Sequence, residues 1–353
     1  MAIIDDIKKI LDYAIWAPSG DNSQPWRFEV EGNTIKVFNI PERDTSFYNY
    51  NQNASLVALG SLIENIKIIS PYYGYTPSIN LLPESTSSTL IATVVLKESQ
   101  KFNDPLYPYI KTRASNRKPY ETRALSTEEK QEILRNDTIT GVSIKLVDDR
   151  ETLEKLADAA SVNEKVVLEN KKLHEFLFHS ITWNEKEDKE KRGFFIKTLE
   201  LKGPQIIGFK LFKHWPILQL FNKLGASNLV SRDNAKLYKQ SGTFVAIIAN
   251  DTTPISFLKT GMAVQRFWLQ AARLNLGAQP ITGVLFLHHR ITTKENSGLS
   301  NKHIALIEKA YSVLESVFET KGKQIIMMFR AGYADKPSAK CLRHDPEIKV
   351  LGR

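Results

Sequence analysis

The ten residues APSGDNSQPW, at positions 17–26, are the most informative stretch of this sequence. Pro18 fixes one backbone angle, and the short polar residues after it favour turn geometry. Such a loop can present amide and hydroxyl donors to the heteroatom edge of a flat ring. On pattern alone we favour a plainer interpretation, in which the loop is a turn between a helix and a strand with a packed Trp26.

The apolar pattern around this loop predicts a helix before it and a hairpin after it. A second series of elements begins near Pro105, and a charged, irregular stretch begins at residue 185. Expected helices cover 3–15, 53–70, 126–134, 150 to about 183, 261–276 and 304–318, with Gly277 as the cap of the fifth. Expected strands cover 27–30, 34–40, 89–96, 142–147, 243–249 and 324–329.

Helices and strands mix without regular alternation, which favours an α+β fold over a doubly wound parallel sheet. The buried helices ASLVALGSLIENIKIIS, at 54–70, and TGMAVQRFWLQAARLNLG, at 260–277, occupy similar places in the two series. Gly60 in the first indicates a close packing approach. This is a weak sign of duplication, and chance similarity between buried helices explains it almost as well.

Composition limits the class of protein. The chain has 353 residues and a formal net charge of +9, but its lysines are spread out, so nucleic acid is the weaker choice of anionic partner. A single cysteine, Cys341, excludes an internal disulfide and fits a reducing compartment. No apolar run reaches about 18 residues, and acids stand where a secretory leader carries bases. We therefore expect a cytoplasmic protein without a membrane span.

Standard catalytic motifs are absent from the sequence. It contains no Gly-x-Gly-x-x-Gly, no Walker loop, no zinc-ligand spacing and no Gly-x-Ser-x-Gly elbow. The absence of these motifs is expected of a protein that works through the chemistry of a cofactor, and it is equally expected of a protein that is not an enzyme.

Three further segments can carry chemistry. In TRASNRKPY, at 112–120, Arg113, Ser115 and Arg117 alternate and can surround a phosphate, although on pattern alone we favour a basic surface turn. In QPITG, at 279–283, proline and glycine let the backbone approach a flat ligand, although an ordinary loop from a helix to a strand is the alternative interpretation. In KCLRHDP, at 340–346, Arg343 can contact a phosphate, although polar tails are common.

Together and in this order, the four segments resemble the nitroreductase-like FMN oxidoreductases, and the likeness spans nearly the whole chain. The family's loop Pro-Ser-x-x-Asn-x-Gln-Pro-Trp is matched by Pro18, Ser19, Asn22, Gln24, Pro25 and Trp26, with Gly20 inside it. Its phosphate motif is matched by Arg113, Ser115 and Arg117. Its Pro-Ile-Glu-Gly loop is matched by Pro280, Ile281 and Gly283, with Thr282 in place of the acid. Its basic C-terminal contact is matched by Arg343 and Lys340.

The chain departs from ordinary members in two ways. Its phosphate motif follows the Pro-Ser loop by about a hundred residues instead of preceding it, and ordinary members are shorter chains that dimerise around shared flavins. The resemblance therefore implies a fused, Acg-like pseudo-dimer with halves at 1–104 and 105–353 and one FMN per chain. The second half would carry the phosphate site. Pairing of two such chains into a homodimer stays open.

The resemblance also implies an activity. NAD(P)H would give hydride to flavin N5, and a small electrophilic acceptor such as a nitroaromatic or a quinone would then take it. The backbone of Thr282 and Gly283 would lie near N5 and Arg117 near the N1–O2 edge, with no catalytic side chain and no metal. Two alternatives stay open: a natural-product tailoring oxidase, and a flavin-sequestering protein in which residues 185–240 form a lid.

Overall fold

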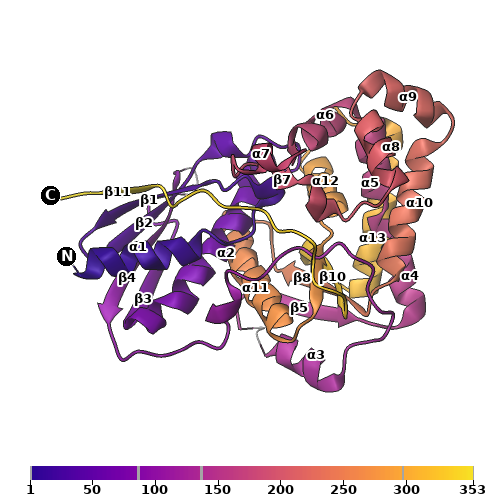
Figure 1. The fold of residues 1–353 in the computed structure, drawn as a ribbon. Helices are drawn as coiled ribbons and strands as arrows, with labels where there is room; N and C mark the ends of the chain where they lie inside the picture. Colours follow the sequence, from indigo (N-terminus) through magenta and orange to yellow (C-terminus); the bar gives the residue numbers. More distant parts are fainter. Residues whose placement is uncertain (1, 86–87, 136–137, 296–297, 353) are drawn as a thin grey trace.

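The computed structural model of the chain describes residues 2–85, 88–135, 138–295 and 298–352, and its strands form two large sheets (Figure 1). The strand order is β11-β1-β2-β4-β3 in the first sheet and β5-β8-β10-β9 in the second. All neighbouring strands in these sheets are antiparallel except β1 and β11, which are parallel. Helices combined with these sheets confirm the α+β class.

The first sheet contains the predicted hairpin of β1 (Trp26–Glu31) and β2 (Thr34–Asn39), together with β4 (Leu90–Glu98). Helix α1 (Ala2–Ala14) precedes the hairpin, as expected. The edge strand β3 (Tyr75–Leu81) was not predicted. Only its first residue is buried and Pro77 lies inside it, so it lacks the apolar alternation of a half-buried strand.

Two long helices, α2 (Asn53–Ile69) and α11 (Pro254–Arg273), pack against each other in the middle of the molecule. The stretch Tyr50–Tyr73 is long and apolar enough to span a membrane by length and composition, but 83% of its most apolar window is buried in the fold. Burial on nearly all sides explains why both helices have apolar residues around their whole circumference.

The crossing of α2 and α11 is reciprocal. A Cβ placed on Gly60 would lie 2.0 Å from the Leu258 carbonyl oxygen, and one on Gly261 would lie 2.0 Å from the Val57 carbonyl oxygen. Each glycine therefore meets the residue three positions before the other glycine. Such mutual correspondence is typical of a two-fold interface, and here it relates two halves of one chain. It supports the internal repeat that the sequence suggested only weakly.

The predicted start and end of the second central helix were wrong. Helix α11 begins seven residues before Gly261, because the Thr253 side chain caps it and Pro254 occupies its first position. It ends near Leu274, and Asn275 takes the left-handed conformation with a φ of 57°. Gly277 is therefore not the cap but the first residue of strand β9 (Gly277–Pro280).

The second sheet contains β9, β5 (Val142–Val147), β8 (Thr243–Ala249) and β10 (Gln324–Gly332). Helix α3 (Thr127–Leu134) has the predicted capping box, and α13 (Asn301–Phe318) matches the last expected helix. Helix α12 (Gly283–Thr292) was not predicted. It directly follows β9, so the segment at 279–283 connects a strand to a helix and not a helix to a strand.

Residues 150–183 do not form one helix. They form α4 (Arg150–Ala160), α5 (Val162–Glu169) and α6 (Lys171–His179), and then the short strand β6 (Ile181–Thr182). The Asn170 side chain accepts a hydrogen bond from the Leu173 amide, so it starts a new helix where continuation was expected.

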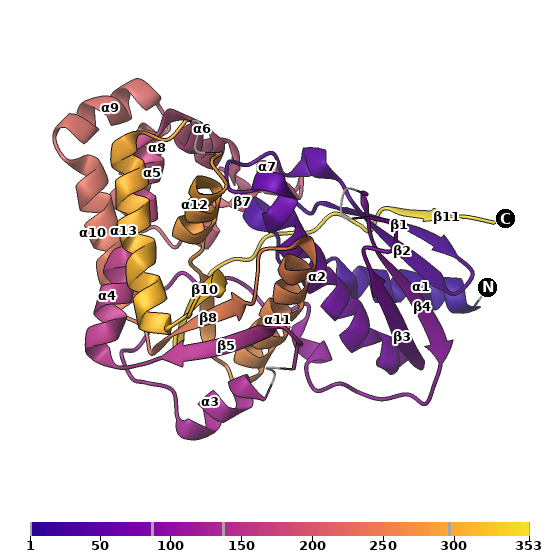
Figure 2. The ribbon, with the colours of Figure 1, turned by 180° about the vertical axis from the view of Figure 1, so that it is seen from behind.

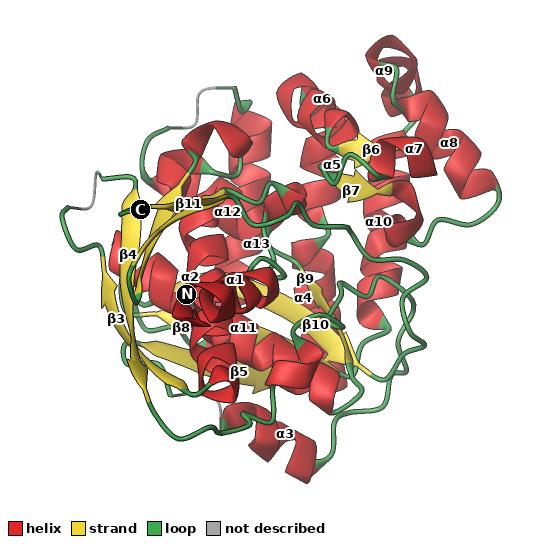
Figure 3. Cartoon of the chain, turned by 60° about the vertical axis from the view of Figure 1, so that its left-hand side comes forward, coloured by secondary structure: helices red, strands yellow, loops and turns green. Residues whose placement is uncertain are grey.

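Residues 185–240 are more regular than expected and are mostly helical. They contain α7 (Glu185–Asp188), β7 (Phe194–Phe195), α8 (Pro204–Phe212), α9 (Trp215–Lys223) and α10 (Ala226–Lys239). Strand β7 pairs in parallel with β6. Helices α8 and α9 form an outer corner of the molecule (Figures 2 and 3). Short 3₁₀ turns elsewhere are η1 (Gly20–Asn22), η2 (Pro41–Arg43), η3 (Tyr50–Gln52), η4 (Ser70–Tyr73), η5 (Tyr107–Tyr109) and η6 (Ile196–Leu199).

The segment after β10 returns to the other half of the molecule. It crosses as an extended strap and ends in β11 (Ile348–Val350), which pairs with β1 of the first sheet (Figure 1). The division into 1–104 and 105–353 stays a prediction, and this strap crosses it.

Candidate active site

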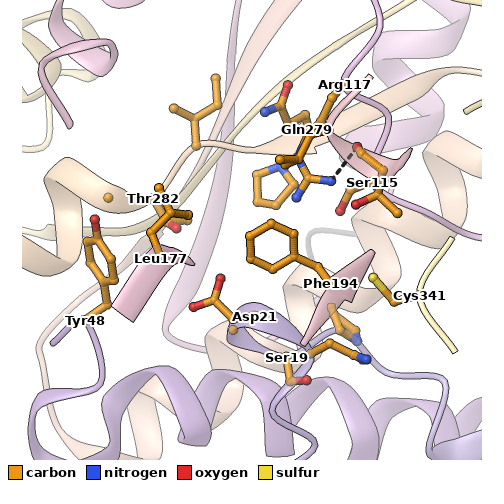
Figure 4. Close-up of a pocket in the computed structure, with 18 of the residues that line it drawn as sticks. Ser19, Asp21, Tyr48, Ser115, Arg117, Leu177, Phe194, Gln279, Thr282 and Cys341 are labelled. Carbon is orange, nitrogen blue, oxygen red and sulfur yellow. Dashed lines mark hydrogen bonds between the residues drawn. The ribbon is translucent and has the colours of Figure 1, made fainter. Parts of the chain in front are cut away.

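All four segments selected from the sequence meet at one cavity of about 540 Å³ (Figure 4). This volume lies within the range of roughly 300–1,000 Å³ that is usual for small-molecule sites. The thirteen predicted site residues all line it: Pro18, Ser19, Gly20, Asn22, Arg113, Ser115, Arg117, Pro280, Ile281, Thr282, Gly283, Lys340 and Arg343.

The loop at 17–26 is a tight turn that is fixed to the strap. Asp21, Asn22 and Gln24 have φ values of 45°, 58° and 50°, in the left-handed region that few residues adopt. Asn22 Nδ2 donates to the Leu342 carbonyl oxygen at 3.0 Å, and the His344 amide donates to Gln24 Oε1 at 2.8 Å. The loop and the strap therefore hold each other in place at the cavity.

Arg113 is a buried cation that contacts no carboxylate in the described part of the chain. Its guanidinium lies 4.2 Å from the Trp268 ring centroid, and Nη2 donates to the Trp16 carbonyl oxygen at 3.3 Å. Its Nε has no hydrogen-bond partner among the described residues. Burial, and then the charge of Arg343, lower its pKa to about 9. A buried charge in this position needs an anion to stabilise it.

Two further cations lie beside Arg113. Arg343 Nη1 donates to Asn22 Oδ1 at 2.6 Å, and its Nε also lacks a partner among the described residues. Lys340 Nζ donates to the Lys111 carbonyl oxygen at 2.8 Å. The pKa of Lys340 is lowered mainly by burial, and the charges of Arg343 and Arg113 also lower it. In the described part of the chain none of the three cations forms an ion pair with an acid.

Arg117 makes different contacts. Its Nη1 donates to the Thr198 carbonyl oxygen at 3.1 Å, and its guanidinium lies 5.9 Å from the Phe194 ring centroid. Both partners belong to the 185–240 segment. Ser115, two residues earlier, lines the cavity beside it (Figure 4).

Three carboxyl groups that were not among the predicted site residues line the cavity: Asp21, Asp44 and Glu164. Burial, and then the charge of Asp44, raise the pKa of Asp21 to about 7 against the opposing charge of Arg117. Burial also raises the pKa of Glu164 to about 7. Asp21 lies inside the loop selected from the sequence, but nothing in the sequence around Glu164 marks it as a site residue.

The Glu164 carboxyl accepts a hydrogen bond from a tyrosine of α10. Its Oε1 accepts from the Tyr238 hydroxyl at 2.8 Å, while its buried Oε2 has no partner among the described residues. A buried carboxyl with one unsatisfied oxygen favours the protonated form.

The turn at 279–283 places the start of α12 against the cavity. Thr282 precedes the helix, and its side chain does not cap it. The amides in the first turn of any helix have no acceptor within that helix. A Cβ on Gly283 would lie 2.0 Å from Asn163 Oδ1, which accepts a hydrogen bond from the Tyr48 hydroxyl at 2.9 Å. Glycine is therefore needed here to let Asn163 approach the helix start.

The first part of the 185–240 segment covers the cavity. Gln24 Nε2 donates to the Lys191 carbonyl oxygen at 2.8 Å, which ties the segment to the predicted loop. Several of its apolar side chains then form one wall: Phe194, Leu199, Leu201 and Phe209. Cofactor-sized ligands in the cavity would be shielded from water on this side.

Comparison with known proteins gives sequence matches to Mycobacterium tuberculosis. The chain is 22% identical over 335 residues to the uncharacterized protein MT1398, and this match covers 92% of the chain and 45% of that protein. It is 26% identical over 94 residues to the putative NAD(P)H nitroreductase acg, over 27% of the chain and 28% of that protein. The chain therefore shares partial sequence similarity with a putative nitroreductase.

The chain covers less than half the length of these curated relatives. No family model matches it. Among solved structures, it is 12% identical to an FMN-bound nitroreductase from Bacteroides fragilis, with a TM-score of 0.36, over 69% of this chain and 95% of that one. It is 14% identical to a BluB-like flavoprotein from Clostridium difficile, with a TM-score of 0.38, over 68% and 94%.

Proposed function

We propose that this nitroreductase-like chain is an FMN-dependent oxidoreductase that passes hydride from NAD(P)H to a small electrophilic acceptor, such as a nitroaromatic or a quinone. The observation that carries the proposal is the meeting of Arg113, Lys340 and Arg343 in one cavity without a carboxylate partner.

The residues present fit the phosphate of FMN. The Nε atoms of Arg113 and Arg343 are buried donors without a hydrogen-bond partner among the residues that the structure describes, and Lys340 adds a third positive charge. Guanidinium groups bind phosphate oxygens through charge-assisted hydrogen bonds, which are shorter and stronger than neutral ones. An anionic ligand would also relieve the repulsion that lowers the pKa of Arg113.

The remaining predicted residues would hold the rest of the cofactor. Ser19, Asn22 and the backbone of Gly20 lie on the loop that lines the cavity, and the Thr282–Gly283 turn lines it as well. Bound FMN would supply the hydride chemistry, since side chains do not carry out such transfer themselves. The replacement of the family's acid by Thr282 leaves the backbone amides in place.

The protein's own part in the reaction is positioning, exclusion of water and control of protons. The apolar wall that includes Phe194 and Phe209 shields the cavity, which strengthens electrostatic interactions inside it. Asp21 and Glu164 hold protons near neutral pH because burial raises the pKa of each to about 7. Such groups suit a site in which an acceptor must be protonated as it is reduced.

The proposal is tested by purifying the protein with added FMN and recording its visible spectrum before and after NADPH is added without air. We expect retained flavin that bleaches with NADPH and is reoxidised by a nitroaromatic or a quinone. Colourless protein that retains no FMN would refute the proposal.

A second candidate is a flavin-sequestering protein with little turnover. It is favoured by the contacts of Arg117 with Thr198 and of Gln24 with Lys191, which close residues 185–201 over the cavity. Steady oxidation of NADH or NADPH in the presence of a nitroaromatic would exclude sequestration. Bound flavin that neither nucleotide can reduce would instead exclude the reductase.

A further inference from the structure

Helices α8 and α9 lie at an outer corner of the molecule (Figure 3), and they carry several exposed apolar side chains. We propose that this outer face, called here the α8–α9 face, docks on the surface of an anionic lipid bilayer. The proposal concerns a surface outside the cavity and does not depend on the proposed reaction.

Exposed apolar side chains are concentrated on this face. Nine large hydrophobic residues are exposed in the described part of the chain, and six of them fall between residues 207 and 229: Ile207, Leu211, Leu220, Phe221, Leu224 and Leu229. Leu224 is 80% exposed and Ile207 65%. Helix α8 has no buried residue at all, although seven of its nine residues are apolar or glycine. Clusters of this kind mark interaction surfaces, whereas single exposed apolar residues need no explanation.

The charged residues within the stretch 201–232 have one sign. Residues 201–232 contain five basic residues and no Asp or Glu: Lys202, Lys210, Lys213, Lys223 and Arg232. Lys210 and Lys223 are exposed on the same two helices as the apolar residues. An apolar face edged by lysines is the pattern that binds anionic membrane surfaces, where the apolar residues enter the headgroup region and the lysines meet acidic lipids.

The face is held in shape by contacts on its inner side. The ring centroids of Phe209 and Phe178 lie 4.9 Å apart, and those of Trp215 and His174 lie 5.0 Å apart. His174 Nε2 lies 2.7 Å from the Phe212 carbonyl oxygen. Because the inner aromatic residues already anchor α8 and α9, the outer ones are not spare core residues awaiting burial within this fold.

Co-sedimentation of the full chain with lipid vesicles tests the proposal. Vesicles of phosphatidylcholine with phosphatidylglycerol are compared with vesicles of phosphatidylcholine alone, at low and high salt. We expect binding only to the anionic vesicles, and weakening by salt because the lysine contribution is screened.

Two variants separate the apolar and the charged parts of the face. Ile207→Glu with Leu220→Glu, and Lys210→Glu with Lys223→Glu, should each weaken vesicle binding about tenfold or more. Matched controls lie elsewhere: Phe102→Glu, at a side chain that is 60% exposed, and Lys309→Glu with Lys336→Glu, at exposed positions. The controls should bind like the wild type.

Three outcomes would overturn the proposal. They are wild-type protein that ignores anionic vesicles, α8–α9 variants that bind as well as their controls, and self-association through Leu220 without vesicle binding. FMN content measured on the same samples keeps this test apart from the proposed function, because a variant can lose vesicle binding and still retain flavin.

Discussion

Gly60 of α2 lies against the backbone of α11 in the same way that Gly261 of α11 lies against the backbone of α2. Neither position has room for a methyl group, because the nearest obstacle is a carbonyl oxygen and not a flexible side chain. Gly60→Ala and Gly261→Ala should each lower the free energy of unfolding by about 1–3 kcal/mol, the usual cost of overpacking a core. Urea denaturation measures this.

The control for this prediction is Gly208→Ala. Gly208 lies within α8, and a Cβ there would meet nothing within 4 Å. Alanine at this position should be neutral or slightly stabilising, since it is the better helix former. Equal stability of all three variants would contradict the close crossing of α2 and α11.

Removal of a cation from the cavity should weaken FMN binding. Arg113→Ala and Arg343→Ala each delete a donor that has a free, buried Nε. A charge-assisted hydrogen bond contributes roughly 1.5–3 kcal/mol, so each dissociation constant should rise roughly 10- to 150-fold. Fluorescence titration of apoprotein with FMN measures it. Arg123→Ala, at an exposed arginine, is the control, and unchanged affinity in both cavity variants would place the phosphate elsewhere.

Arg117→Ala should loosen the cover of the cavity. The substitution removes the hydrogen bond from Nη1 to the Thr198 carbonyl oxygen and the contact with Phe194. Amide hydrogen exchange over residues 194–201 should become faster, while exchange in α13 should not change, because local opening depends on local contacts. Unchanged exchange over 194–201 would show that Arg117 does not hold this segment closed. We also expect weaker FMN retention, as the sequence motif predicts.

Asp21 should make the apoprotein less stable as the pH rises. Its pKa is about 7 in the folded protein, against an ordinary value of 3.8 for an aspartate, so between these two pH values the folded state holds the proton more strongly. Stability therefore falls as the pH rises through this window. Asp21→Asn avoids this loss. At about pH 8 the variant should be more stable by up to a few kcal/mol, since one pKa unit corresponds to about 1.4 kcal/mol.

Below about pH 4 the wild type and Asp21→Asn should be equally stable, because Asp21 is then protonated in both the folded and the unfolded wild type. Urea denaturation at both pH values measures the difference, with Asp5→Asn at an exposed position as the control. A constant difference between Asp21→Asn and wild type at both pH values would mean that the carboxyl does not titrate as proposed.

Much of the fold could be predicted where local pattern and tertiary packing agree. Strand β5 and the capping box of α3 were expected at their observed positions, because apolar alternation and the Ser126–Glu129 pair act locally. Helix α2 was expected from its apolar spacing alone. The weak repeat gained support only from the reciprocal contacts of Gly60 and Gly261, which no sequence pattern contains.

The errors have physical causes. The start of α11 was missed although Thr253 and Pro254 form a recognisable helix start, because its apolar residues become dense only later. Strand β3 escaped prediction because an edge strand with one buried residue has almost no apolar signal. The helices of 185–240 escaped it because their apolar residues face both inward and outward, which obscures the period.

Some residues of the candidate site could be predicted from the sequence, and others could not. The sequence led to thirteen residues that line one cavity, since the motifs that carry them are short and contiguous. Glu164, Tyr48 and Asn163 could not be found this way. They reach the cavity from elements far apart in sequence, and only the fold brings them together.

The strap that carries Lys340 and Arg343 from the second sheet back to β11 also sets an order of events during synthesis. A ribosome-bound chain that has emerged only as far as residue 330 possesses both central helices and Arg113, yet it lacks two of the three cations. The pocket that we propose for FMN is therefore unfinished until the strap has docked. Newly made chains would acquire their flavin after translation of this segment and not while the halves are still folding.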